Sequence, residues 1–366
     1  MDKDLVYISE EKYNELKRSS IKEGDILIAK TGATIGKIGV FKRYDKAIIS
    51  SSCLKLSLKN DINHDFFKYL LISDSGQSQI LSEAAGSTRD TINIEPFSNL
   101  FFAMPKNDEQ DNIVSFLDSK TSQINQTIEK DKQLIELLKE KRTALINHAV
   151  TKGLDPNVKL KDSGIDWIGE IPEGWDVIKL KFIADERKEK ERDGKEKHLL
   201  GLENIESSTT KIIEYNSTEN IEGESLKFEK NDVLFGKLRP YLAKVTLVDR
   251  VGCCTSEIIV YKSTKKILPK FLMYKLVSKK YIDYINSLTY GVKMPRADPN
   301  TLSNIKQSVP PFEEQRKIAQ YLNKATSKID KTIQKIEEKI KLLEEYKKSL
   351  IHHVVTGKVD VRGVEA

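Results

Sequence analysis

The chain has 366 residues, 39% of them hydrophobic and 32% charged, and it carries a net charge of +6. This length predicts two or three structural units. No apolar run approaches the roughly 20 residues of a membrane helix, so we expect no membrane association. The first residues, MDKDLVYISEE, are polar and acidic, unlike a signal or transit peptide, and we therefore expect a cytoplasmic location. A charge of this size allows nucleic acid as a partner, but only local basic clusters would argue for it.

The cysteines and histidines predict no metal site. Cys53, Cys253 and Cys254 lack the spacing of zinc ligands, and adjacent cysteines rarely form a disulfide with each other. We therefore expect buried thiols in a reducing compartment. His148 and His353 stand at equivalent ends of two predicted helices, where a cation suits the helix dipole, so we expect capping rather than catalysis.

Short strands are predicted at the start of the chain. The apolar run 26–29 follows a turn at residues 24–25, and apolar residues alternate with polar ones over 53–58. A glycine-punctuated loop, 30–37, lies between these two strands. Residues 66–72 predict a short helix with its apolar side facing inward.

Two long helices follow from the spacing of apolar residues. Over 104–150 and over 309–355 these residues recur every three or four positions, which places one apolar stripe on each helix while Lys and Glu occupy the other faces. Pro310 and Pro311 before the second segment and Gly357 after it are typical helix boundaries. A helix this long with a single apolar stripe needs a partner helix.

The chain supplies that partner through an internal repeat. Shifting 104–150 by 205 positions overlays it on 309–355 without a slip in register, and an offset of 207 overlays 24–30 on 231–237. The whole unit, a globular domain followed by a long helix, is therefore repeated. The predicted fold is mixed α/β, with two globular α/β-type domains separated by two long antiparallel helices that form a coiled coil. Because the helices match better than the loops, we expect one scaffold with two different binding surfaces.

This pattern divides the chain into six predicted parts. They are a first globular domain over 1–103, a first long spacer helix over 104–152, a connector over 153–174, a second globular domain over 175–308, a second long spacer helix over 309–356 and a tail over 357–366.

Three stretches of this sequence resemble type I restriction-modification specificity subunits. They are the helix start PPFEEQRKIAQYLNK, the strand–loop–strand GDILIAKTGATIGKIGVF and the connector GIDWIGEIPEGWDVIKLKFIA. The resemblance covers essentially the whole chain and implies two target recognition domains, each of which contacts half of a split site in double-stranded DNA. It also implies partners: two methyltransferase (modification) subunits that carry S-adenosylmethionine and modify adenine, and restriction (motor and nuclease) subunits that use ATP and Mg²⁺.

Loops with basic side chains are the candidate DNA contacts. The loop 32–38 is one residue short of a phosphate-binding G-x-x-x-x-G-K-[ST] motif, and Ile38 stands in place of the required hydroxyl, so an ordinary glycine turn is the simpler interpretation. Both copies nevertheless place basic residues where the apolar strand ends, and such residues can contact base edges and phosphates. A solvated turn remains the alternative for each loop. The candidates are Lys30, Thr31, Thr34, Lys37 and Arg89 in the first copy, and Lys237, Arg239, Tyr241, Lys293 and Arg296 in the second.

Catalytic motifs are not found. The sequence shows no complete phosphate-binding loop, no cofactor-binding glycine loop and no Asn-Pro-Pro-Tyr-like pocket for a flipped adenine. We therefore expect a non-catalytic subunit without a cofactor of its own. Two alternatives stay open, namely a coiled-coil scaffold that binds protein, and a split specificity subunit that needs a complementing fragment.

The first copy lacks a counterpart of residues 175–207, the segment that opens the second globular domain. This segment is rich in apolar residues, which we expect to cover or extend a sheet. The first domain is therefore predicted to be shortened at its N-terminus, and either loosely folded or completed by another chain.

Overall fold

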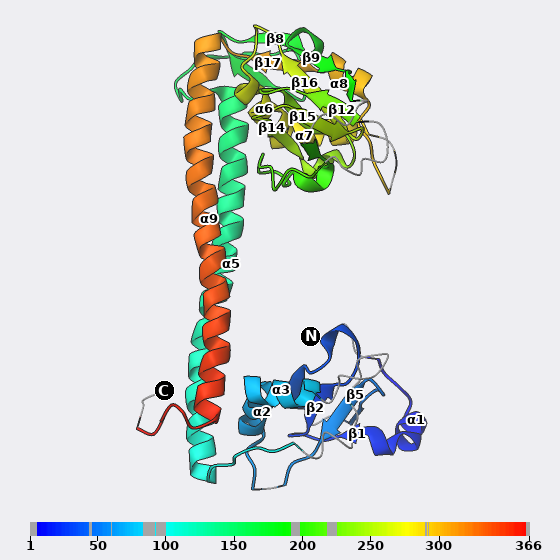
Figure 1. The fold of residues 1–366 in the computed structure, drawn as a ribbon, viewed down its shortest axis with the longest axis vertical. Helices are drawn as coiled ribbons and strands as arrows, with labels where there is room; N and C mark the ends of the chain where they lie inside the picture. Colours follow the sequence, from blue (N-terminus) through cyan, green and yellow to red (C-terminus); the bar gives the residue numbers. More distant parts are fainter. Residues whose placement is uncertain are drawn as a thin grey trace. The chain divides into compact units, whose positions relative to one another are not determined.

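The computed structural model describes residues 6–43, 46–59, 61–82, 92, 100–191, 198–217, 225–289, 291 and 293–363. The chain divides into two compact units. Unit 1 comprises residues 1–134 and 335–366, and unit 2 comprises residues 135–334 (Figure 1). Each unit contains one globular domain, the first part of the long helix that follows this domain, and the last part of the other long helix.

The domain of unit 1 contains two small sheets and a helix pair. A three-stranded antiparallel sheet has the order β3-β2-β5, and a second sheet pairs β1 with β4. Ile26 and Ile28 of the sheet pack with Leu71 and Ile80 of the helices in a buried core, together with Ile92. The elements are α1 (Glu10–Glu15), a 3₁₀ turn (Lys17–Ser19), β1 (Ser20–Ile21), β2 (Ile26–Ala29), a 3₁₀ turn (Gly32–Thr34), β3 (Ile38–Val40), β4 (Ala47–Ile48), β5 (Cys53–Leu56), α2 (His64–Ile72) and α3 (Asp74–Ser82).

The domain of unit 2 contains the same plan with additional strands. Its sheets have the orders β14-β13-β16-β9, β10-β12-β15-β11 and β17-β8, and β6 pairs with β7 in the connector. Cys253 and Cys254 are buried in β15, and burial raises the pKa of the Cys254 thiol, while Cys53 is partly buried. The strands are β6 (Leu160–Asp162), β7 (Glu170–Pro172), β8 (Asp176–Lys179), β9 (Ala184–Arg187), β10 (Lys190–Glu191), β11 (Leu199–Leu200), β12 (Ser225–Phe228), β13 (Val233–Gly236), β14 (Val245–Leu247), β15 (Gly252–Thr255), β16 (Ile258–Ser263) and β17 (Lys306–Val309). The helices are α6 (Pro269–Val277), α7 (Lys279–Ser287) and α8 (Pro299–Asn304), with 3₁₀ turns at Leu180–Phe182, Leu202–Asn204 and Pro240–Leu242.

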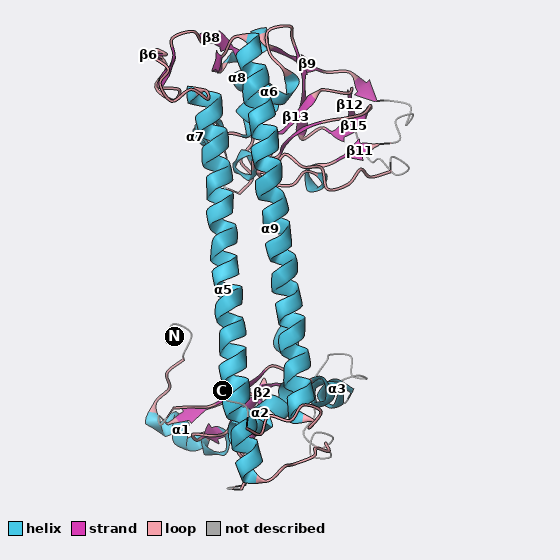
Figure 2. Cartoon of the chain, turned by 90° about the vertical axis from the view of Figure 1, so that its left-hand side faces the viewer, coloured by secondary structure: helices cyan, strands magenta, loops and turns pink. Residues whose placement is uncertain are grey.

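The two predicted long helices are α5 (Asn107–Lys152) and α9 (Phe312–Val355), drawn side by side in Figure 2. They run antiparallel within each unit, as their cross-helix contacts show. In unit 1 the Nζ of Lys347 lies 2.9 Å from Oδ1 of Asn125, and the Nζ of Lys339 lies 2.8 Å from Oδ2 of Asp131. In unit 2 the Nε of Arg142 lies 3.0 Å from Oδ1 of Asp330, and Gly153, directly after α5, lies beside Glu314 of α9. Among the described residues, none of the helices is both long and apolar enough to cross a membrane.

The internal repeat is confirmed by the pairing registers of the two domains. Ile26 of β2 faces Leu56 of β5, and Val233 of β13 faces Tyr261 of β16, which is the same pair shifted by the offsets of the repeat. The helices α2 and α6 begin and end at positions that differ by 205, as do α3 and α7. The predicted mixed α/β fold with two domains and two long helices is therefore confirmed.

A buried glutamine joins each domain to the start of its long helix. Oε1 of Gln315 accepts a hydrogen bond from the backbone N–H of Leu268, and its Nε2 donates to the carbonyl of Pro310. Gln110 makes the same two bonds, to Asn63 and Pro105. Gln315 lies within the helix start PPFEEQRKIAQYLNK, and Gln110 is its counterpart at the repeat offset of 205, so this glutamine serves as a structural joint in both copies.

Candidate nucleic-acid interface

The two candidate loops of the second domain lie together. Leu238 and Arg296 form an antiparallel β-bridge. The N–H of Arg239 donates to the carbonyl of Pro295 at 2.8 Å, and the N–H of Ala297 donates to the carbonyl of Lys237 at 2.9 Å. The loops 237–241 and 293–296, which are far apart in sequence, thus form one surface, which we call the second recognition surface.

The side chains of this surface are available to a ligand. Arg239, Lys293 and Arg296 are exposed, Lys237 is partly exposed, and Tyr241 is 51% exposed. Arg239 has a left-handed backbone with φ of 50°, which a non-glycine residue adopts at a cost and which often marks functional loops. Nη2 of Arg296 lies 2.8 Å from Oε1 of Glu257, an exposed ion pair that competes only weakly with a new partner.

The first domain arranges its corresponding loop in the same way. The N–H of Lys30 donates to the carbonyl of Ser52, and the N–H of Ile92 donates to the carbonyl of Lys30 at 3.1 Å, as Ala297 does to Lys237. Thr34 and Lys37 are exposed, whereas Lys30 and Thr31 are partly buried. Arg89 lies outside the described residues. We call the loop 30–37 the first recognition surface.

A third segment, 206–211, lies beside the second recognition surface and was not predicted from the sequence. The N–H of Ser208 donates to the carbonyl of Ala243, and a cavity of about 270 Å³ is lined by Ser208, Tyr241 and Arg142. Ser208 and Thr210 have φ of 62° and 68°, so this segment also holds left-handed non-glycine residues.

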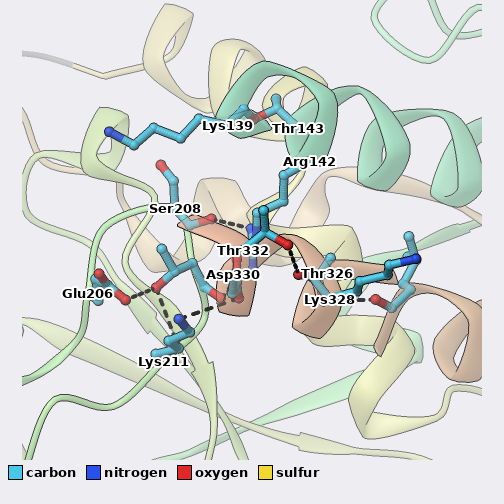
Figure 3. Close-up of polar contacts among 12 residues, drawn as sticks. Lys139, Arg142, Thr143, Glu206, Ser208, Lys211, Thr326, Lys328, Asp330 and Thr332 are labelled. Atoms are coloured by element: carbon cyan, nitrogen blue, oxygen red, sulfur yellow. Dashed lines mark hydrogen bonds and ion pairs between the residues drawn. The ribbon is translucent and has the colours of Figure 1, made fainter. Parts of the chain in front are cut away.

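Arg142 of α5 fixes this segment, as Figure 3 shows. Its Nη1 donates to the carbonyl of Ser208 at 2.7 Å, its Nη2 donates to the carbonyl of Thr209 at 2.5 Å, and its Nε contacts Asp330 of α9. Asp330 also lies 3.5 Å from Nζ of Lys211. The sequence carried one signal for this role, because Arg142 falls at a stripe position of the helix between Ile135 and Ile146, where an apolar residue is expected.

Within the described part of the chain, no group of three or more His, Cys, Asp or Glu side chains is placed to hold a metal ion. The two recognition surfaces instead offer donors: ammonium and guanidinium groups, hydroxyls and backbone N–H groups. Such groups can hydrogen-bond to phosphates and to base edges.

Comparisons with known proteins agree on one family. The family described as type I restriction modification DNA specificity domain matches residues 4–137 and 172–342. The type I restriction enzyme MjaVIII specificity subunit of Methanocaldococcus jannaschii is 27% identical over 361 residues, covering 94% of this chain and 81% of that protein. The EcoDI specificity subunit of Escherichia coli is 23% identical, covering 77% of this chain and 65% of that protein.

Solved structures share the fold. One is described as "Structural basis underlying complex assembly and conformational transition of the type I R-M system", with a TM-score of 0.74 at 14% identity over 93% of this chain and 83% of that chain. The HsdS subunit from Thermoanaerobacter tengcongensis gives a TM-score of 0.53 at 15% identity over 93% and 82% of the two chains. Because the family match covers more than half of the sequence, the chain belongs to the type I restriction-modification DNA specificity family, whose members are DNA sequence-specificity subunits.

Proposed function

We propose that the second recognition surface contacts the bases of one half of a split DNA site, and that the first recognition surface contacts the other half. The observation that carries this proposal is the β-bridge between Leu238 and Arg296. It unites two loops whose basic side chains are exposed, and the backbone of the first domain repeats the arrangement at Lys30 and Ile92. A guanidinium group can donate two hydrogen bonds to one guanine edge, which makes Arg239 and Arg296 the leading candidates for base contacts.

The chain itself carries out no methyl transfer or cleavage under this proposal. Chemistry belongs to partners, namely two methyltransferase subunits that bind S-adenosylmethionine and a restriction subunit that uses ATP. The long helices serve as spacers between the two recognition domains and as part of the surface for the methyltransferase subunits. The segments 104–152 and 309–356 are the predicted spacers, and 1–103 and 175–308 are the predicted recognition domains.

The test is to purify the chain with its methyltransferase subunits and S-adenosylmethionine, and to sequence the methylated DNA. Arg239→Ala and Arg296→Ala should each relax one half of the motif and leave the other half intact. Loss of a base contact removes about 1–3 kcal/mol of discrimination, whereas loss of a phosphate contact weakens binding to all sequences and flattens the salt dependence.

Lys265→Ala is the matched control, because Lys265 is exposed on the same domain at the turn between β16 and α6, outside both loops. It should leave the motif unchanged. An unchanged motif and affinity in both arginine variants would rule out these loops as the recognition surface. Methyl transfer by the rigorously purified chain alone would contradict the assignment of chemistry to partners.

A further inference from the structure

Two backbone edges of the first domain have no strand paired with them among the described residues. The strand β5 pairs with β2 on one side only, and residues 101–104, which lead into α5, form no strand. In the second edge, the side chain of Gln79 bonds to the N–H and the carbonyl of Phe101. Between these edges lies an open cavity of about 690 Å³ with a mainly apolar lining, which includes Leu54, Leu56, Phe67, Leu71, Leu100 and Phe102. An unpaired strand edge beside an apolar cavity is a site where another strand can add.

The second domain shows what fills the equivalent place. Its β17, the counterpart of residues 101–104, pairs with β8, and its β16, the counterpart of β5, pairs with β9. The segment 176–187 therefore crosses from one edge to the other as strand, 3₁₀ turn and strand. Leu180 and Ile183 of this segment are fully buried, and Ala184 is 2% exposed.

Apolar residues along these edges are more buried in the second domain than their counterparts are in the first domain. Val309 at the end of β17 is 5% exposed, whereas its counterpart Met104 is 41% exposed. Ile259 and Tyr261 of β16 are buried, whereas their counterparts Leu54 and Leu56 are only partly buried. The first domain thus has the apolar surface that the segment 176–187 covers in the second domain, but no equivalent of this segment is found among its described residues.

A buried carboxylate supplies a second, independent observation. In the second domain Asp232 is 3% exposed, and its Oδ2 accepts a hydrogen bond from Nε of Arg187 at the end of β9. Its counterpart Asp25 is 2% exposed and accepts hydrogen bonds from the N–H of Lys22 and the hydroxyl of Ser57, but no ion pair to it is found among the described residues. Arg187 also pairs with Glu229 and Glu189. Lys22 occupies the position of Glu229, so an arginine beside Asp25 would lack that one carboxylate partner.

We propose that the first domain binds a strand–turn–strand segment of a separate polypeptide, with the chemistry of residues 176–187. Its first strand pairs with residues 101–104, its turn places two apolar side chains in the cavity, and its second strand pairs with β5 and directs an arginine to Asp25. A second copy of this chain is a poor donor, because its own segment is held by Leu180, Ile183 and the pairing of β8 and β9. This proposal concerns the folding of the first domain, so it stands or falls separately from the DNA contacts proposed above.

The experiment uses the full chain and a fluorescently labelled synthetic peptide, DVIKLKFIADER, which has the sequence of residues 176–187. Fluorescence anisotropy should show saturable binding with one peptide per chain. Hydrogen exchange should slow at residues 53–58 and 101–104 and stay unchanged at 258–263. Peptides with the equivalent of Leu180→Asp or Arg187→Glu should each bind at least about tenfold more weakly. The first peptide would bury an unpaired charge, and the second would bring a carboxylate to the carboxylate of Asp25.

Three outcomes would overturn the proposal. One is the absence of saturable binding, and another is equal affinity of the three peptides. The third is slow exchange, in the chain alone, at those N–H groups of residues 53–58 that do not bond to β2. If that protection grows with protein concentration as the chain dimerises, a second copy is the occupant; if it does not, the chain covers its own edge.

Discussion

Replacing Arg142 with Met should loosen the segment 206–211 that lies beside the second recognition surface. The side chain is 5% exposed and donates to the carbonyls of Ser208 and Thr209 as well as to Asp330. Removing one partner of a buried ion pair costs about 3–5 kcal/mol. Nζ of Lys211 lies 3.5 Å from Asp330 and would still offset part of the carboxylate charge, so we expect the lower value, about 3 kcal/mol.

The internal repeat provides a matched control for this variant. Lys347 occupies the position equivalent to Arg142, and Asn125 the position equivalent to Asp330, yet the Lys347 contact is a single hydrogen bond to a neutral amide at the helix surface. Because this contact is exposed to solvent, it contributes at most about 1 kcal/mol. Lys347→Met should therefore have a much smaller effect in unit 1 than Arg142→Met has in unit 2.

Hydrogen exchange with mass spectrometry measures this difference locally. The backbone N–H groups of Glu206, Ser208 and Ile213 are hydrogen-bonded to Lys211, Ala243 and Asn204, so their exchange reports opening of the segment. A loss of about 3 kcal/mol predicts exchange roughly a hundredfold faster in Arg142→Met. Exchange of this segment within threefold of wild type, or an equal loss of protection around Asn125 in Lys347→Met, would refute the assignment of Arg142 as its anchor.

Three further predictions follow from contacts described in the two units. Burial and then the nearby charge of Lys280 lower the pKa of Lys275 from 10.5 to about 7, so between these values the unfolded chain holds a proton that the folded chain lacks. Stability should thus rise with pH over that window by at most about 1.4 kcal/mol per pH unit. Lys275→Leu installs the residue found at the equivalent position 70. In this variant the midpoint temperature of thermal denaturation should no longer rise from pH 7 to 10, and an unchanged rise would contradict the burial of the ammonium. Gln315→Ala should leave the N–H of Leu268 and the carbonyls of Lys266 and Pro310 without partners. The free energy of unfolding, measured by urea denaturation, should fall by about 1–3 kcal/mol for each group left buried. A fall of less than about 1 kcal/mol in total would argue against the joint. Inserting four residues into both α5 and α9 adds about 6 Å to each helix, which should lengthen the gap between half-sites by about two base pairs, and methylated motifs with an unchanged gap would contradict a spacer role.

The sequence predicted features that depend on local order and on repetition. Apolar spacing was enough for α5 and α9, because a stripe of Ile and Leu residues with no interrupting Gly or Pro permits little else. The constant offset between copies then predicted the shared plan of the domains, which the registers of β2 and β13 confirm.

Other features depend on pairing between distant segments and were beyond sequence reasoning. The bridge between Leu238 and Arg296 joins residues that are far apart in the chain, and no local pattern marks it. Arg142 stands at an apolar position of its helix, but its partners Ser208 and Thr209 lie in a loop whose path depends on left-handed backbone angles. The roles of the candidate residues in DNA contact, and the boundaries of the six parts, remain predictions.

The glutamine joints have a consequence for how such chains can vary over generations. Gln110 and Gln315 bond to their domains through backbone atoms of Asn63 and Leu268, so the joint does not depend on which side chains the domain carries there. A genetic crossover within the long helices would therefore deliver a different domain together with an intact attachment. Under such exchange, a stock of n domains yields up to n² ordered combinations, and recognition can diversify without any new helix packing.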